Sequence, residues 1–135
     1  MPQVYFMAPY ATERPLVLIV EDEYLIRTYA AEVIRDAGFE VVEASNADEA
    51  IRILESRPDI RVVFTDVQMP GSMDGLKLAH AVRDRWPPVH IIATSGHYAF
   101  NKGDLPTGTV FLPKPYSPHN IASALHTLTD SQYMR

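Results

Sequence analysis

Residues 16–23 have the sequence LVLIVEDE, in which five apolar residues, Leu16–Val20, are followed directly by Glu21 and Asp22. A short apolar run rich in Val and Ile is typical of a strand that is buried on both faces of a parallel sheet. The acidic pair then lies at the carboxyl end of this strand. Ligands of open α/β folds bind at that edge of the sheet, where the strand order reverses. The stretch therefore predicts a parallel sheet with a polar site at its edge.

Three further apolar runs also end at a polar side chain: Val62–Thr65 before Asp66, Val89–Thr94 before Ser95, and Thr109–Leu112 before Lys114. Because the carboxyl ends of parallel strands meet at one edge of a sheet, we expect these side chains to lie close together. Acidic groups at two strand ends, a hydroxyl at a third and a lysine at a fourth suit a hard metal ion and a phosphoryl group.

The segments between the apolar runs carry apolar residues at helical spacing, with a second strand at Phe39–Ala44. The predicted helices stop at Gly38, Pro58 and Pro87. Their N-caps are Asn46, Asp74 and Ser117. His97–Gly108 leaves room for a turn or two of helix at most. With right-handed crossovers, this pattern predicts an α/β fold: a flavodoxin-like, doubly wound (βα)5 parallel sheet of strand order 2-1-3-4-5 with a shortened fourth helix.

The chain of 135 residues has the length of one domain. We predict an N-terminal tail at residues 1–14, the domain at residues 15–130 and a C-terminal tail at residues 131–135. Since the chain ends shortly after its last predicted helix, we expect a stand-alone domain without an output domain.

Composition argues against several classes of function. The chain is 47% hydrophobic and 21% charged, which are globular values. A net charge of −5 without a basic run argues against a nucleic-acid partner. The absence of cysteine excludes disulfides and thiolate metal sites. No apolar stretch could cross a membrane and no signal peptide is recognisable, so we expect a cytoplasmic protein without membrane contact.

The three acidic residues predict a metal site. In the expected fold, Glu21 and Asp22 face Asp66 across the crevice between the first and third strands. A divalent cation would relieve their repulsion, and oxygen ligands without His or Cys favour Mg²⁺ over zinc. One carboxylate can instead act as a nucleophile and form an acyl phosphate, with the Lys114 ammonium group stabilising the phosphoryl oxygens.

Four motifs, each after a predicted strand, resemble the receiver domain of two-component response regulators: VLIVEDE at Val17–Glu23, FTDVQMP at Phe64–Pro70, ATSGH at Ala93–His97 and LPKPY at Leu112–Tyr116. The resemblance extends from Pro15 to the end of the last helix. It implies a protein that accepts a phosphoryl group from a histidine kinase or a histidine phosphotransfer protein in the presence of Mg²⁺. Such a protein hydrolyses its own aspartyl phosphate but is not a turnover enzyme.

The resemblance implies roles at the matched positions. Asp66 would be the phosphoacceptor, and Lys114 would pair with the phosphoryl oxygens. Asp22 would bind Mg²⁺ directly together with Asp66, Glu21 would bind it mainly through water, and the backbone carbonyl of Gln68 would be a further ligand. The peptide bond between Lys114 and the following proline is expected to be cis.

The resemblance also implies a switch. Ser95 would move to hydrogen-bond the phosphoryl group, and the N–H of Gly96 would reach a phosphoryl oxygen. Phe111 would be the switch aromatic residue, without a hydroxyl to report its rotamer. Gln68 and His97 would tune dephosphorylation by admitting or placing the attacking water.

The chain departs from the family pattern in two places. Gly71–Met73 is one residue longer than the common pattern, so we expect the loop beside Asp66 to bulge. The short fourth helix alters the surface that reports phosphorylation to a downstream protein, and we expect a monomer or a weak dimer. The first helix is the expected kinase-docking face, with Tyr24, Ile26 and Arg27 as candidate contacts.

Three alternatives stay open at this point. A phosphorylation-independent pseudo-receiver would use the same fold as a binding module. A small flavin electron carrier shares the topology alone, and fold does not establish function. A phosphatase with an aspartyl nucleophile would ordinarily have a second Asp close after the first as general acid, whereas position 68 is Gln.

Overall fold

Five parallel strands form one sheet in the order β2-β1-β3-β4-β5. The structure, a computed structural model, describes residues 14–69, 71, 73–96 and 101–133. Its elements are β1 (Leu16–Val20), α2 (Tyr24–Asp36), β2 (Glu40–Ala44), α3 (Ala47–Ser56), β3 (Ile60–Asp66), α4 (Gly75–Arg85), β4 (His90–Ser95), the 3-10 helix η1 (Lys102–Asp104), β5 (Val110–Pro113) and α5 (Pro118–Tyr133). The predicted flavodoxin-like topology is confirmed, and η1 is the shortened fourth helix.

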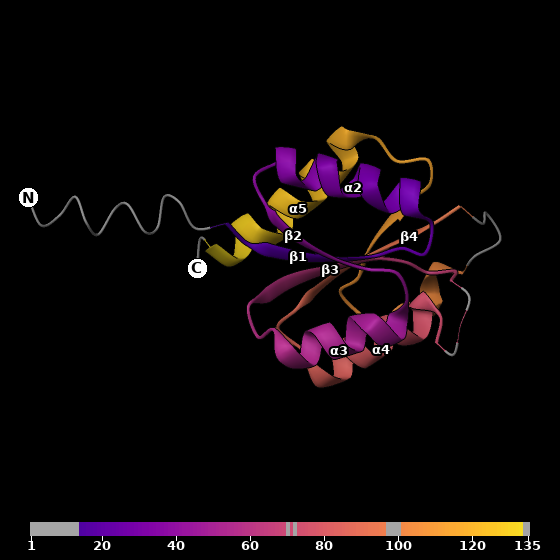
Figure 1. The fold of residues 1–135 in the computed structure, drawn as a ribbon. Helices are drawn as coiled ribbons and strands as arrows, with labels where there is room; N and C mark the ends of the chain where they lie inside the picture. The colour runs from indigo at the N-terminus through magenta and orange to yellow at the C-terminus, as the bar shows by residue number, and fades with distance from the viewer. Residues whose placement is uncertain (1–13, 70, 72, 97–100, 134–135) are drawn as a thin grey trace, which may run out of the picture.

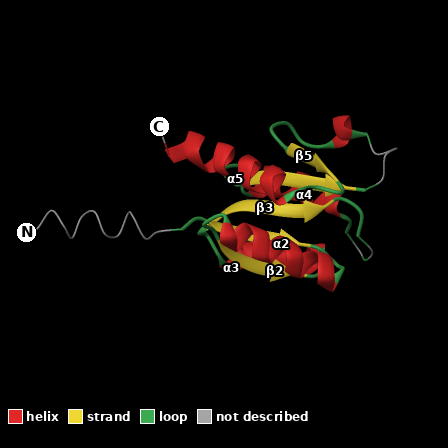
Figure 2. Cartoon of the chain, turned by 90° about the horizontal axis from the view of Figure 1, so that it is seen from above, coloured by secondary structure: helices red, strands yellow, loops and turns green. Residues whose placement is uncertain are grey.

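Helices cover both faces of the sheet: α2 and α5 lie on one side, and α3 and α4 on the other (Figure 1). Successive residues of β1 therefore alternate between two hydrophobic clusters. Val17 and Ile19 pack with the α2 and α5 side chains, whereas Leu18 and Val20 pack with those of α3 and α4. All of β1 is buried, as expected for the central part of a parallel sheet. The strands run in the same direction, so their carboxyl ends share one edge (Figure 2).

Local capping accounts for the helix ends. Gly38 follows α2 with a φ of 104°, a conformation that favours glycine, and its N–H donates to the carbonyl of Arg35. The side chain of Asn46 accepts from the N–H of Glu49 at 2.8 Å. The Oγ of Ser117 accepts from the N–H of Asn120 at 3.0 Å, with Pro118 as the first helical residue. These predicted stop and start signals are confirmed.

β1 has the predicted bounds, the other strands differ from the predicted ones by one or two residues at an end, and Asp66 is itself the last residue of β3. Pairing with β4 extends to this residue, because the N–H of Val67 donates to the carbonyl of Thr94 at 2.8 Å. The helix α5 continues to Tyr133, past the domain boundary predicted at residue 130. Neither glycine nor proline follows Leu128 to end the helix earlier.

No helix in the described part of the chain has both the length and the apolar character needed to span a membrane.

Candidate functional site

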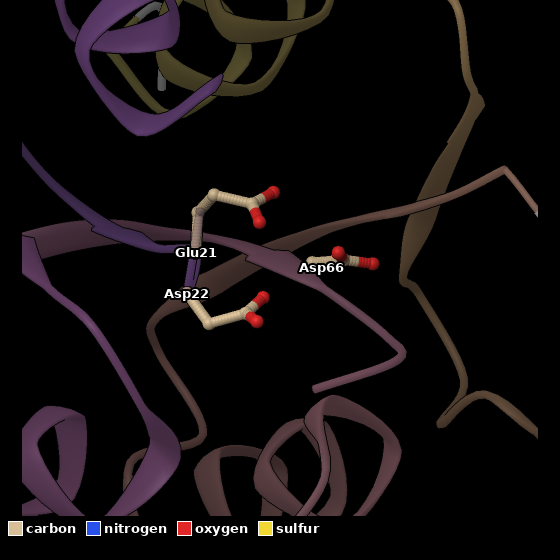
Figure 3. Close-up of side chains that lie close together, drawn as sticks. All are labelled: Glu21, Asp22 and Asp66. Carbon is tan, nitrogen blue, oxygen red and sulfur yellow. The ribbon is translucent and has the colours of Figure 1, made fainter. Parts of the chain in front are cut away.

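Three carboxylates meet at the carboxyl edge of the sheet. Glu21 and Asp22 follow β1, and Asp66 ends β3; the two strands are neighbours in the sheet. One carboxylate oxygen from each residue lies within 4.8 Å of the other two, and the close-up shows the three groups converging (Figure 3). Glu21 and Asp66 are 4% and 6% exposed, whereas Asp22 is exposed to solvent. The cluster is therefore buried on one side and open on the other.

Lys114 joins this cluster from the residue directly after β5, which lies two strands away from β3. Its Nζ lies 3.0 Å from Asp66 Oδ2 and 3.2 Å from Glu21 Oε1. Its backbone N–H donates to the carbonyl of Ser95 at 2.9 Å, and the peptide bond to Pro115 is cis, as predicted. Three carboxylates and one ammonium group leave two net negative charges. This excess charge and the oxygen-only donor set fit a divalent hard cation such as Mg²⁺.

The electrostatics of the site favour a charged lysine. Burial raises the pKa of the Glu21 carboxyl above its ordinary value, and the negative charge of Asp66 adds to the rise. For Lys114, burial lowers the pKa, but the hydrogen bond and charge of Asp66, together with the charge of Glu21, outweigh it and raise the pKa. Lys114 therefore stays protonated near neutral pH. A cation at the cluster would offset the repulsion that Glu21 experiences.

Both carboxylate oxygens of Asp66 are oriented by hydrogen bonds. Oδ2 faces Lys114, and Oδ1 accepts from the N–H of Gln68 at 3.1 Å. The backbone after Asp66 is fixed by α4, because the N–H of Gly75 donates to the carbonyl of Val67 at 2.8 Å. A Cβ atom on Gly75 would lie 1.8 Å from the carbonyl oxygen of Asp66. Only glycine permits this approach of the first turn of α4 to the end of β3.

The predicted switch residues lie around the same edge. The Oγ of Ser95 donates to Oε1 of Gln68 at 3.2 Å, so the hydroxyl contacts the Gln68 side chain beside Asp66. Gly96 lies next to Lys114, whose Cβ would be 3.6 Å from an added methyl group. Phe111 is half-buried in β5, and Nζ of Lys102 in η1 lies 5.8 Å from its ring centre. His97 lies outside the described residues, as do Pro70 and Ser72 of the loop expected to bulge.

Two residues near the site, Arg27 and Gly75, make contacts that the sequence analysis did not assign to them. Arg27 was predicted as a contact for a kinase, but its side chain is only 15% exposed and bonds to Glu43 and to the carbonyl of Glu21. The partner Glu43 lies on another strand, and no local pattern links the two. Gly75 did carry a signal, because a glycine directly after the helix cap Asp74 has no conformational need and points to close packing.

Tyr116 gives the site a measurable pH dependence. Burial raises the pKa of Tyr116 to about 12 from an ordinary value of 10.0, and its ring packs edge-on against Phe64. We expect the free energy of unfolding to fall as the pH rises from about 10 to about 12, because only the unfolded chain releases the phenolic proton there. Urea unfolding across this range measures the fall.

Tyr116→Phe should remove part of this fall, and Tyr24→Phe, at an exposed tyrosine, should leave it unchanged. Lys114 has a raised pKa as well, so the stability that it contributes is lost in the same direction and the fall does not vanish. Equal pH profiles for the two tyrosine variants would contradict a half-buried Tyr116 that stays protonated in the folded chain.

The sequence of this chain is similar to those of response regulators and their receiver domains. Residues 17–126 match the model of the response regulator receiver domain. An NtrX-like response regulator of Rickettsia bellii is 39% identical over 82 residues, which cover 60% of this chain and 17% of that protein. The sensor kinase CckA of Brucella abortus is 34% identical over 121 residues, which cover 86% of this chain and 13% of that protein. The chain thus spans less than a fifth of the length of these two relatives.

Solved structures give the same result. A response regulator receiver protein of Sinorhizobium medicae superposes with a TM-score of 0.81 at 28% identity, over 87% of this chain and 96% of that one. The receiver domain of the hybrid histidine kinase CckA superposes with a TM-score of 0.70 at 34% identity, over 84% of this chain and 97% of that one. Receiver domains are signalling modules of two-component systems. With the family match covering most of its length, this chain belongs to the response regulator receiver domain family.

Proposed function

We propose that a histidine kinase or a histidine phosphotransfer protein phosphorylates Asp66 in a Mg²⁺-dependent reaction, and that the product state alters a protein-binding surface. The contact that carries this proposal is the 3.0 Å approach of Lys114 Nζ to Asp66 Oδ2 beside the Glu21 and Asp22 carboxylates. An aspartate in a cluster that is open on one side and carries compensating positive charge is the arrangement that an acyl-phosphate intermediate requires.

In the proposed reaction, a carboxylate oxygen of Asp66 attacks the phosphorus of a phosphohistidine. The new P–O bond forms as the P–N bond breaks, and the imidazole that leaves takes a proton from solvent. Asp22 and Asp66, with the Gln68 carbonyl and with Glu21 through water, would hold the metal. Bound Mg²⁺ would supply positive charge and a coordination position for a phosphoryl oxygen. Lys114, protonated at neutral pH, would pair with the incoming phosphoryl oxygens.

Ser95 and Gln68 would connect the modification to the surface. Because the Ser95 hydroxyl donates to Gln68, it has to leave that partner before it can donate to a phosphoryl oxygen. The N–H of Gly96 would provide a second donor. Displacement of Ser95 would free space on the side of Phe111, which packs beside Lys102 of η1. This sequence of moves would change the surface formed by η1 and β5 and so bind or release a downstream protein.

An apolar groove beside the site supports docking of a histidine-bearing partner. It has a volume of about 440 Å³ and is lined by six residues of α2 and the β5–α5 connection: Leu25, Ile26, Tyr29, Lys114, Pro115 and Tyr116. Leu25 in the groove is 79% exposed and its neighbour Tyr24 is 66% exposed, so the groove and its rim together present apolar surface to solvent. Since Lys114 contacts Asp66 and also lines the groove, a partner bound there would lie next to the phosphoacceptor.

Incubation with acetyl phosphate and Mg²⁺ tests the proposal. We expect an Asp66-dependent mass increase of one phosphoryl group that is abolished by a chelator. Beryllofluoride should shift the NMR resonances of residues around Ser95, η1 and β5. A chain that gains no mass and shows no shift with either reagent would instead support the phosphorylation-independent pseudo-receiver.

Asp22→Ala should weaken Mg²⁺ binding by about 10- to 100-fold, because a metal ligand at the open side of the cluster is lost. Isothermal titration calorimetry measures the affinity. Asp48→Ala is the matched control, since Asp48 lines the same surface pocket as Asp22 but does not belong to the carboxylate cluster. Unchanged affinity in Asp22→Ala, or equal losses in both variants, would exclude Asp22 as a ligand.

A further inference from the structure

Lys114 binds the Glu21 carboxylate, and a second side chain, that of Arg27, ties the backbone of the turn that carries the acidic pair to β2. Arg27, in the first turn of α2, donates from Nη1 to the carbonyl of Glu21 at 2.8 Å. Its Nε donates to Oε1 of Glu43, on β2, at 3.1 Å. Its own backbone N–H donates to the carbonyl of Glu23 at 2.9 Å. The Arg27 side chain therefore links the carbonyl that precedes Asp22 to β2, whereas the bond to Glu23 is the first backbone bond of α2, which any residue at this position can make.

The guanidinium group suits this place. The Arg27 side chain is 15% exposed, and a charged group that is largely withdrawn from solvent needs several polar partners. A planar fork of donors can serve a carboxylate and a carbonyl at the same time, whereas an ammonium group acts from a single point. Glu43 is set opposite Ile19 of β1 by the strand register, so it provides a fixed anchor for Arg27.

The turn also needs such an anchor on electrostatic grounds. Asp22 is exposed, and its carboxylate lies close to those of Glu21 and Asp66. Repulsion between like charges pushes the exposed member of the cluster outward. Glu21 is held by Lys114 and by the N–H of Glu23 at 3.1 Å. Asp22 depends on the conformation of the backbone around it, and Arg27 fixes that backbone.

We infer that Arg27 is a positioning residue of the metal site: by tying the carbonyl of Glu21 to Glu43 on β2, its side chain keeps the Asp22 carboxylate in the place where Mg²⁺ binds. This inference rests on the proposed function, because it assigns Arg27 to the same Mg²⁺ site. Arg27 does not touch the metal or the phosphoryl group. Its effect acts on metal affinity through the backbone of the turn.

Calorimetric titration of the full chain with MgCl₂ tests the inference. We expect Arg27→Gln to weaken Mg²⁺ binding by about tenfold, as is usual when a residue that orients a metal ligand is lost. Arg27→Lys should restore part of the affinity. Arg35→Gln is the matched control. Arg35 also lies on α2, 3.7 Å from the same Glu43, so this substitution removes the same charge at a residue that does not contact the turn. Its affinity should change by no more than about twofold.

Two further readouts separate positioning from a general loss of structure. Urea unfolding without Mg²⁺ shows whether each variant is folded under the conditions in which its Mg²⁺ affinity is measured. The rate of phosphorylation by acetyl phosphate should fall in Arg27→Gln at low Mg²⁺ and return close to the wild-type rate at saturating Mg²⁺. A merely structural role would leave the Mg²⁺ affinity of the folded variant equal to that of the wild type.

The inference is overturned by wild-type affinity in Arg27→Gln, by an equal loss in Arg35→Gln, or by a rate that saturating Mg²⁺ does not restore. A wild-type chain that binds Mg²⁺ but takes up no phosphoryl group would refute the proposed function alone. The role of Arg27 would still be tested by the Mg²⁺ affinity of its variants relative to the wild type. A wild-type chain that binds no Mg²⁺ would overturn both.

Discussion

Asp66→Asn is expected to take up no phosphoryl group from acetyl phosphate or from a phosphorylated histidine donor. The amide replaces the carboxylate oxygen that would attack phosphorus, while the side chain keeps its size and its contact with the N–H of Gln68. Mass spectrometry after incubation with acetyl phosphate and Mg²⁺ measures the uptake. Without Mg²⁺, the free energy of unfolding should rise slightly, by less than about 1 kcal/mol, because one of the crowded negative charges is removed.

Asp48→Asn is the control for this variant, since Asp48 is an exposed aspartate near the same edge of the sheet. It should be labelled at the wild-type rate. Equal labelling of Asp66→Asn and the wild type would mean that a different side chain accepts the phosphoryl group. The functional assignment would then be wrong even though the fold and family are established.

Gly75→Ala is expected to destabilise the fold by about 2–4 kcal/mol. The added Cβ would lie 1.8 Å from the carbonyl oxygen of Asp66 and 2.8 Å from Cα of Val67, and both neighbours are backbone atoms that cannot rotate away. Either the first turn of α4 or the end of β3 has to move. Because Asp66 ends β3, Mg²⁺ binding should weaken in the same variant. Urea unfolding and calorimetry measure the two effects.

Gly96→Ala is the comparison for stability. Its Cβ would meet Cβ of Lys114 at 3.6 Å, which is an ordinary van der Waals distance, so the free energy of unfolding should stay within about 0.5 kcal/mol of the wild type. If Gly75→Ala unfolds at the same urea concentration as Gly96→Ala, α4 does not approach β3 as closely as described.

The carboxylate cluster could be predicted in outline because its members follow buried strands. The strand order then brings β1 and β3 together, and with them Asp22 and Asp66. The order of the four motifs along the chain also predicts that Lys114 belongs to the site. Lys114 lies 48 residues from Asp66 in the sequence, and its Nζ lies 3.0 Å from Asp66 Oδ2 in the structure. The end of α5 at Tyr133 carries no such signal, because a helix end without glycine or proline has no marked stop in the sequence.

The strands, the helix caps and the edge that carries the site could be predicted from local sequence. The apolar runs, Gly38, Asn46 and Ser117 act within a few residues of their own positions. Contacts across elements depend on strand register and helix placement, which local chemistry does not specify. The bonds from Arg27 to Glu43 and from Ser95 to Gln68 join residues 16 and 27 positions apart. Tertiary packing therefore decided that an arginine on α2 contacts the acidic turn, and how closely the first turn of α4 approaches β3 at Gly75.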